Sequence, residues 1–265
     1  MTVYESQEPY TGVLFFTDPH LAATPPFERR ENYLEHVLAK ISACLELAQE
    51  RQLLPVLLGD LFHRNPGDVH RVLRRAFEVL GPYAGTKFRP WVLQGNHDQW
   101  EGASPEDSCL TVTALAGMIH LMDTSGIHCR FDAAGHRVAL GGTPYGSPHP
   151  DAVDSDVRGD AEYVLWGSHC GLGFRDKRHK YPPLHEIPGV DWVMNGHMHW
   201  HQPTETLGMT RWSNIGGMTR MSFAPRNQER ELCAGIWTPG CEDLDRWAIP
   251  HLPFNQVFPV RPFPP

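Results

Sequence analysis

The spacing of hydrophobic residues in the first third of the chain alternates between strand-like and helix-like periods. Residues 12–17 form a short apolar run, and residues 31–51 then carry apolar side chains at helical spacing. Residues 55–58 repeat the strand pattern, residues 68–80 repeat the helical one, and residues 91–94 form a third apolar run. Strands that alternate with helices are joined by crossovers, so we expect these three to run parallel in one sheet.

From about residue 118 the pattern changes to strands with few helices. The expected strands are residues 118–122, 127–131, 137–140, 163–167, 192–195, 211–215 and 232–237. We expect them to form a second sheet that packs on the first.

Two Pro-rich segments cannot hold a central strand. Residues 143–160, rich in Pro, Gly, Asp and Ser, are expected to form a long loop. Residues 250–265 contain six prolines among aromatic residues. We therefore divide the chain into a folded domain over residues 1–249 and a Pro-rich tail over residues 250–265. The tail could dock a partner through its exposed aromatic side chains, or it could lie flat on its own domain.

The composition is typical of globular proteins that fold without disulfide bonds. It has 265 residues, of which 41% are hydrophobic, and its six cysteines form no Cys-x-x-Cys pair, so we expect reduced thiols. No apolar run approaches the roughly 18 residues that a membrane span requires. Residues 1–10 carry acids and a proline instead of the basic and apolar parts of a signal peptide. We expect a soluble cytoplasmic protein without a membrane partner.

The formal charge of −8 argues against a protein that coats nucleic acid by bulk electrostatics. It does not exclude a nucleic-acid substrate, because bound divalent cations can make a cleft positive on an acidic protein.

Side chains that can bind metals follow the apolar runs directly. They are Asp18, His20, Asp60, Asn96, His97, His169, His197 and His199. Because each comes at the end of a predicted strand, we expect them to converge on the sheet rim where α/β proteins bind ligands.

The residue types suit a pair of divalent metal ions. Two metals about 3.5–4 Å apart need a bridging anion flanked by oxygen and imidazole donors, and Asp60 is the natural bridge. The Asp18-x-His20 and His197-x-His199 spacings place two side chains on one side of an extended segment. Each piece alone is common by chance, but five pieces in this order are specific for a metal site.

Taken together, these motifs resemble those of the calcineurin-like metallophosphoesterases. The matching segments are Asp18-x-His20, Gly59-Asp60-Leu61-Phe62-His63, Gly95-Asn96-His97-Asp98, His169 and Gly196-His197-Met198-His199. The resemblance covers about residues 12–238. It implies an α/β fold, a four-layer α/β/β/α sandwich of two mixed sheets flanked by helices, and a metal-dependent phosphoesterase activity.

The same resemblance implies a division of the ligands between the two metals. Asp18, His20, Asp60 and His199 would hold one ion, and Asp60, Asn96, His169 and His197 the other. Mn²⁺ is the expected metal, with Fe²⁺, Zn²⁺ and Mg²⁺ as alternatives. A metal-bridging hydroxide would attack phosphorus, with His97 as general acid or charge stabiliser. Asp98 would orient His97 through a hydrogen bond, or it would serve as a helix or turn cap.

Within this superfamily the chain resembles the catalytic domain of SbcD-type DNA repair exonucleases. His63 matches the extra histidine of their Gly-Asp-Leu-Phe-His stretch, and the segment Trp212 to Phe223, with Arg220, is similar to their Asn-Pro-Gly-Ser-x-x-Arg-x-Ser segment. Ile215 and Gly217 depart from that pattern, and a plain glycine-rich turn is the alternative interpretation. Basic residues expected to contact a phosphate backbone are Arg64, Arg175, Lys177, Arg178 and Arg220. For the run at residues 175–180, a solvated loop is the alternative.

Three functional hypotheses follow. The first is a DNA nuclease, with DNA as substrate and an SMC-like ATPase and a second copy of the chain as possible partners. Only some 66 residues follow His199, so we expect the capping domain of such nucleases to be absent. The second is a phosphodiesterase or phosphatase acting on small nucleotides or other phosphoesters. The third is a scaffold that keeps the fold without catalysis, although no ligand position is replaced here.

Overall fold

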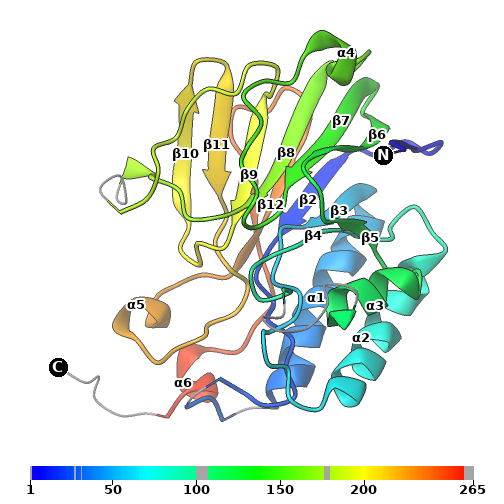
Figure 1. The fold of residues 1–265 in the computed structure, drawn as a ribbon. Helices are drawn as coiled ribbons and strands as arrows, with labels where there is room; N and C mark the ends of the chain where they lie inside the picture. The colour runs from blue at the N-terminus through cyan, green and yellow to red at the C-terminus, as the bar shows by residue number, and fades with distance from the viewer. Residues whose placement is uncertain (1, 27, 31, 100–106, 176–179, 260–265) are drawn as a thin grey trace.

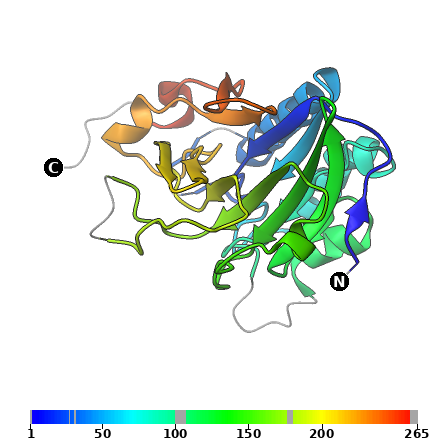
Figure 2. The same ribbon diagram turned by 90° about the horizontal axis from the view of Figure 1, so that it is seen from above.

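Two mixed β-sheets lie face to face, and helices cover the outer face of one of them (Figures 1 and 2). The structure is a computed structural model, and it describes residues 2–26, 28–30, 32–99, 107–175 and 180–259. No described helix is both long enough and apolar enough to cross a lipid bilayer.

The six-stranded sheet contains the predicted parallel strands at its centre. Its strands are β2 (Gly12–Phe16), β3 (Leu53–Leu57), β4 (Trp91–Leu93), β5 (His120–Met122), β12 (Cys233–Trp237) and β13 (Asp245–Ala248). Their order is β13-β12-β2-β3-β4-β5. Strands β2 to β5 pair in parallel, while β12 joins β2 antiparallel and closes that side with β13.

The seven-stranded sheet is built from the second half of the chain and one N-terminal strand. Its strands are β1 (Tyr4–Glu5), β6 (Gly126–Ala133), β7 (His136–Thr143), β8 (Tyr163–His169), β9 (Trp192–Gly196), β10 (Gln202–Leu207) and β11 (Thr210–Asn214). Their order is β1-β6-β7-β8-β9-β11-β10. The pairs β7-β8, β8-β9 and β9-β11 are parallel, so their carboxyl ends point the same way.

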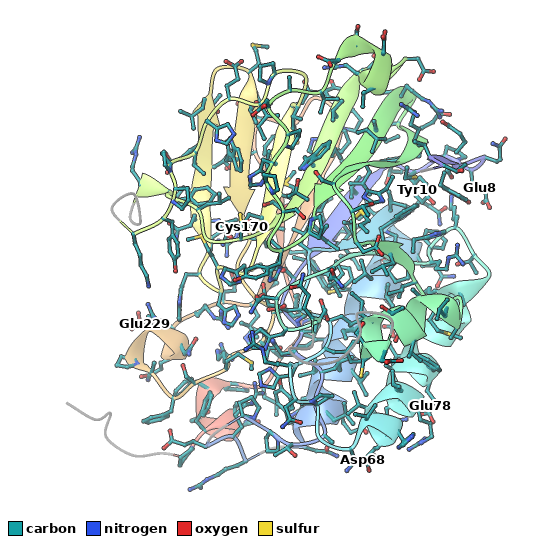
Figure 3. All side chains as sticks on the ribbon, in the orientation of Figure 1. Glu8, Tyr10, Asp68, Glu78, Cys170 and Glu229 are labelled. Atoms are coloured by element: carbon teal, nitrogen blue, oxygen red, sulfur yellow. The ribbon has the colours of Figure 1, made fainter. Side chains whose placement is uncertain are left out.

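Three helices cover the six-stranded sheet. They are α1 (Tyr33–Glu50), α2 (Val69–Ala84) and α3 (Cys109–Leu115), and their apolar faces form one core with Leu14, Phe16 and Leu57 of the sheet. The opposite face of α2 is polar and exposed, as Glu78 marks in Figure 3, and Asp68 caps the start of the helix. Burying one face of each helix accounts for the helical spacing of apolar residues in the sequence.

A second core fills the space between the sheets, with Phe15, Trp91, Phe131, Trp192 and Trp237 among its buried side chains. The outer face of the seven-stranded sheet has a third core, which includes Trp166, Phe174 and Trp212. In the described residues this face is covered by loop segments rather than by long helices, and the single-turn helix α4 (Ser155–Arg158) buries none of its residues. The two mixed sheets and the helical layer confirm the predicted α/β fold, with a thin outermost layer.

The prediction from sequence assigned two strands to the wrong sheet and ended one helix too early. The runs 118–122 and 232–237 belong to the first sheet, as β5 and β12, because pairing between distant strands is not encoded in their order along the chain. Helix α2 continues past residue 80 through Gly81 and Pro82 to Ala84. Glycine has no Cβ to clash with the following proline ring, so the helix can pass this point.

Several elements were not predicted. They are strands β1, β10 and β13, helix α3 and the single-turn helices α4, α5 (Pro225–Gln228) and α6 (Phe254–Val257). All six cysteines are free, as expected.

The described part of the Pro-rich segment packs on the rest of the chain. Val257 and Phe258 are buried, and the rings of Phe254 and Phe258 contact Phe223. The Val257 carbonyl accepts a hydrogen bond from the Arg30 backbone N–H (3.0 Å). Residues 250–259 therefore lie on the folded domain in this structure.

Candidate metal centre

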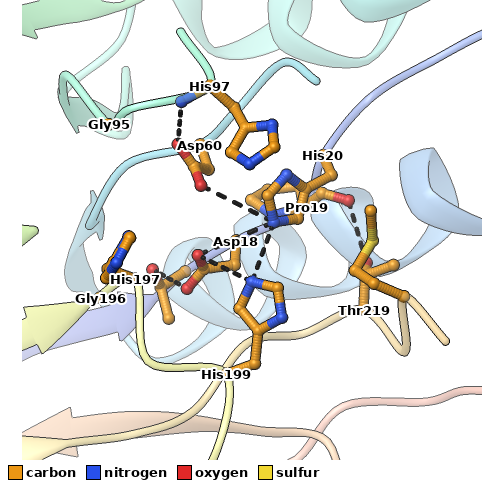
Figure 4. A network of polar contacts seen from close by, with 12 residues as sticks. Asp18, Pro19, His20, Asp60, Gly95, His97, Gly196, His197, His199 and Thr219 are labelled. Carbon is orange, nitrogen blue, oxygen red and sulfur yellow. Dashed lines mark hydrogen bonds and ion pairs between the residues drawn. The ribbon is translucent and has the colours of Figure 1, made fainter. Parts of the chain in front are cut away.

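Strand ends from both sheets supply the predicted metal ligands. Asp18 and His20 follow β2, Asp60 follows β3 and Asn96 follows β4, all in the six-stranded sheet. His169 ends β8, while His197 and His199 follow β9 in the seven-stranded sheet. The structure brings all seven together, although they span residues 18 to 199 of the sequence (Figure 4 labels five of them).

The first group of ligand atoms contains Asp18, His20, Asp60 and His199. His20 Nε2 lies 3.1 Å from His199 Nε2, 3.8 Å from Asp18 Oδ1 and 3.7 Å from Asp60 Oδ2. His199 Nε2 lies 3.5 Å from Asp18 Oδ1. Two imidazole nitrogens and two carboxylate oxygens therefore point at one small volume, which is the donor set that Mn²⁺, Fe²⁺ and Zn²⁺ accept.

The second group shares Asp60 with the first. His169 Nε2 lies 3.4 Å from the same Asp60 Oδ2 and 3.2 Å from Asn96 Oδ1, and His197 Nδ1 lies 2.9 Å from Asn96 Oδ1. The other Asp60 oxygen, Oδ1, accepts a hydrogen bond from the His97 backbone N–H (2.7 Å). Asp60 is thus fixed between the two groups, where one carboxylate can serve both ions.

Two observations indicate that these residues can bind a pair of cations. Asp18 Oδ1 is buried and has no hydrogen-bond partner, although Asp18 Oδ2 accepts from Thr17 Oγ1 (2.7 Å). A buried carboxylate oxygen without a partner is costly unless a cation binds it. In addition, Asp18, His20, Asp60 and His197 all have positive φ angles between 54° and 67°. Left-handed backbone at four non-glycine residues is strain of the kind found at functional sites.

Gly95, which precedes Asn96, is required because the loops after β3 and β4 approach each other closely. A Cβ built on Gly95 would lie 2.3 Å from Asp60 Oδ1 and 2.4 Å from the Asp60 backbone nitrogen. Only glycine therefore fits beside the bridging carboxylate.

We expect Gly95→Ala to lose metal binding, because the added methyl group must displace Asp60. The matched control is Gly85→Ala, where φ is −94° and a Cβ would meet no atom within 4 Å. That control should keep its metal and gain about 0.4–1 kcal/mol of stability. Metal analysis of both purified variants tests this, and full metal content in Gly95→Ala would contradict it.

His97 and His63 form a stack of imidazoles beside the first group of ligands. Their ring centroids are 4.8 Å apart with planes inclined by 17°, and the His97 ring packs edge-on against His20 at 4.7 Å. His97 Nδ1 accepts from the Arg64 backbone N–H (3.4 Å), so in the neutral ring the proton resides on Nε2. Burial lowers the pKa of both His63 and His97, although the charge of Asp60 opposes this shift. Both rings are therefore neutral at pH 7 in the metal-free site.

Asp98 binds backbone N–H groups, as the alternative of a turn cap predicts, and does not orient His97. Its Oδ1 accepts from the Phe62 backbone N–H (2.9 Å) and its Oδ2 from the Gly95 backbone N–H (2.9 Å). Burial and the charge of Asp60 raise the pKa of Asp98 to about 7. Asp98 thus ties the loop after β3 to the loop after β4 and positions Asp60 and Asn96, rather than orienting the His97 ring.

Two asparagines position the His197 and His199 loop, and the sequence analysis missed this role. Asn214 Nδ2 donates to the Met198 carbonyl (2.8 Å) and the Trp200 carbonyl (2.7 Å). Its Oδ1 accepts from Asn195 Nδ2 (2.9 Å). Asn214 lies in the segment that resembles the nuclease motif, so the motif was the available signal, whereas nothing in the sequence distinguishes Asn195.

The predicted basic residues have different positions. Arg64 follows His63 beside the metal ligands, and its side chain is exposed. Arg175 lies near β10, where its backbone N–H donates to Glu205 Oε1 (2.6 Å). Lys177 and Arg178 fall outside the described residues.

The prediction that Arg220 binds substrate is wrong. Its side chain is buried, and it donates to the Leu252 carbonyl (3.1 Å), the Arg230 carbonyl (2.7 Å) and His251 Nε2 (3.2 Å). These bonds hold the segment after β13 against the rest of the fold, so the guanidinium cannot contact a polymer at the surface.

Comparison with known proteins agrees with this geometry. The sequence profile of the calcineurin-like phosphoesterases matches residues 12–201. The chain belongs to this family. The phosphoesterase is also similar to the protein TT1561 of Thermus thermophilus, with 11% identity, a TM-score of 0.51 and coverage of 91% of this chain and 100% of that one. A hypothetical protein from Thermus thermophilus has 16% identity and a TM-score of 0.49, with 90% and 99% coverage. No curated protein matches the sequence.

The phosphoesterase is therefore a metal-dependent hydrolase, in which different residues would hold the metals and orient their ligands. Asp18, His20, Asp60, Asn96, His169, His197 and His199 would hold two divalent ions, which supply Lewis acidity and lower the pKa of bound water. Thr17 orients the Asp18 carboxylate by a hydrogen bond.

His97 would act as a neutral hydrogen-bond donor and not as a general acid. In the neutral ring Nε2 carries the proton, and the ring packs edge-on against His20. Such an N–H donor would stabilise the charge that develops on the leaving oxygen of a substrate.

The protonation of the metal-free phosphoesterase predicts how metal binding depends on pH. Burial opposes a charge on His169, but Asp60, Asp18 and the Leu58 carbonyl outweigh it and raise the pKa of His169 to about 9. Burial lowers the pKa of His20 to about 3, and the pKa of His197 is lowered as well. At pH 7.5 the metal must therefore displace the proton of His169, but none from His20 or His197.

We expect metal binding to release about one proton from His169 at pH 7.5, with apparent affinity rising as the pH approaches 9 and levelling above it. Calorimetric metal titrations in buffers of different ionisation enthalpy measure this number directly. An apparent affinity that falls between pH 7 and 9 would contradict the assignment.

Proposed function

We propose that the phosphoesterase is a Mn²⁺-dependent phosphodiesterase whose substrate is DNA. The observation that carries this proposal is the neutral imidazole pair, His63 stacked on His97, beside the metal ligands. A phosphodiester has a single negative charge and a bulky leaving group, which suits neutral hydrogen-bond donors. A phosphomonoester dianion is more often bound by arginine forks.

An exposed aromatic side chain beside the metal ligands supports a substrate with bases. The Tyr145 ring is 38% exposed and lies 5.6 Å from the His197 ring and 6.3 Å from the His169 ring, measured between centroids. Bases of a nucleic-acid strand stack on such rings with little sequence preference.

A second candidate is hydrolysis of small phosphodiesters such as cyclic nucleotides. The net charge of −8 favours it, because the protein surface repels a polyanion outside the site.

One assay separates the two candidates. The phosphoesterase is incubated with Mn²⁺ and labelled single- or double-stranded DNA, or with bis-p-nitrophenyl phosphate, p-nitrophenyl phosphate or cyclic nucleotides. We expect cleavage of DNA and of bis-p-nitrophenyl phosphate, and loss of both activities in His97→Ala. Cleavage of small diesters alone would favour the second candidate, and preference for the monoester would reject both.

Tyr145→Ala tests the stacking contact on its own. We expect KM for DNA to rise and kcat to stay similar, because the contact is made in both ground and transition states. Hydrolysis of bis-p-nitrophenyl phosphate should change much less, which makes the small diester the internal control.

A further inference from the structure

The first group of metal ligands opens to solvent at His199. The side chains of Asp18, His20 and Asp60 are at most 2% exposed, whereas the side chain of His199 is 30% exposed. A substrate therefore approaches this group of ligands from the side of His199. Residues that surround His199 on that side are placed to contact the part of the substrate that extends beyond the metals.

Trp200 follows His199 directly and carries an arginine against its ring. The Arg226 guanidinium carbon lies 4.3 Å from the centroid of the Trp200 ring, which is within the range of a cation–π contact. Arg226 belongs to α5, and Figure 1 shows α5 beyond the carboxyl ends of β9 and β11. The fold thus brings a guanidinium from a distant segment close to the open side of the metal centre.

The backbone that carries Trp200 is held in place by several hydrogen bonds. The Trp200 carbonyl accepts from Asn214 Nδ2 (2.7 Å). The His199 carbonyl accepts from the Gly217 backbone N–H (3.1 Å) and from the Arg230 guanidinium. The Trp200 ring is therefore a fixed surface on which the Arg226 side chain is oriented.

The charge of Arg226 is not neutralised within the described part of the chain. Arg226 is exposed, and no described carboxylate forms an ion pair with it, including Glu229 and Glu231 nearby in sequence. Glu231 pairs instead with Arg246 (3.7 Å). The protein has 31 acidic residues and only 23 lysines and arginines, so an excess of positive charge does not explain an unpaired arginine here. A guanidinium that stacks on an aromatic ring keeps its N–H groups available at its edge.

We propose that Arg226, stacked on Trp200, binds a second phosphate group of the substrate, next to the phosphate that reacts at the metals. Two parallel N–H groups of a guanidinium match two oxygens of a phosphate. This inference rests on the proposed function, because it takes the substrate to be a nucleotide or a nucleic-acid strand with more than one phosphate. Arg226 would then favour such substrates over esters with a single phosphate.

Thymidine 3′,5′-bisphosphate and thymidine 5′-monophosphate are suitable probes, because they differ only in the second phosphate. The metal-loaded protein is titrated with each nucleotide by calorimetry. We expect the bisphosphate to bind about tenfold more tightly, and this preference to shrink as the salt concentration rises. Equal affinity of the wild type for the two nucleotides would overturn the proposal.

Arg226→Ala tests the location of the second phosphate. We expect the preference for the bisphosphate to fall to about twofold or less in this variant, and to be partly restored in Arg226→Lys, which keeps the charge without the planar group. The matched control is Arg211→Ala, because Arg211 also stacks on a tryptophan, 5.2 Å from the Trp192 ring centroid. These two residues lie at the starts of β11 and β9, away from the strand ends that carry the metal ligands, so the control should keep the full preference.

Melting temperatures confirm that the variants are folded. If the preference for the bisphosphate persists in Arg226→Ala, or is lost equally in Arg211→Ala, Arg226 does not bind the second phosphate and the proposal fails. The measurement follows binding rather than turnover, so it is separate from the test of the proposed function. A wild type that prefers the bisphosphate but cleaves no DNA would reject DNA as the substrate and leave the phosphate contact of Arg226 in place.

Discussion

Replacing His97 with alanine is expected to reduce phosphodiester hydrolysis by about 10²–10³-fold while both metal ions remain bound. The reason is geometric. His97 Nδ1 is occupied by the Arg64 backbone N–H, which leaves the proton of the neutral ring on Nε2. The seven proposed ligands do not include His97, so truncation of the ring removes a hydrogen-bond donor and leaves the metal-binding atoms in place.

The measurement is steady-state hydrolysis of bis-p-nitrophenyl phosphate with metal content determined on the same samples. His70→Ala is the matched control, because His70 is exposed on α2. Unchanged turnover in His97→Ala would refute its role in stabilising the leaving oxygen. Loss of metal in that variant would instead make His97 a ligand.

Asp60→Asn is expected to remove both metal ions together with the activity. One Asp60 oxygen lies near His20 and His169, one histidine from each ligand group, and the other accepts from the His97 backbone. An amide lacks the charge that two cations require and has a single acceptor oxygen. Loss of an outer-shell partner already costs about 10–100-fold, so loss of the shared ligand should cost more.

Metal analysis and hydrolysis assays again provide the test, here with the exposed Asp151→Asn as control. Asp60→Asn should bind less than one ion per chain under conditions that saturate the wild type. Retention of one tightly bound ion would mean that the two groups are independent, and Asp60 would then belong to only one of them.

The metal ligands could be predicted from the sequence because their chemistry is tied to strand ends. Asp18, Asp60 and His169 come at the ends of apolar runs, and the parallel pairing of those runs brings their carboxyl ends to one rim. Residue type and position along the chain were therefore sufficient to select the metal ligands, without knowledge of the distances between them.

The remaining features depend on contacts that leave no local pattern. The assignment of β5 and β12 to the first sheet depends on pairing between strands far apart in sequence. Arginine is a residue type that often binds phosphate, but tertiary packing buries Arg220 against Leu252 and His251. Asp98 lies next to His97 in sequence, yet its carboxylate is directed to the backbone of Phe62 and Gly95. In each case the three-dimensional neighbours, rather than the residue type, decide the role.

The central claim is that seven side chains from two sheets hold a pair of divalent cations that share Asp60. Crystals soaked with Mn²⁺, with data collected at the manganese absorption edge, test it most directly. The account predicts two anomalous peaks about 3.5–4 Å apart, on either side of Asp60 Oδ2. A single peak, or two peaks that do not share Asp60, would contradict it.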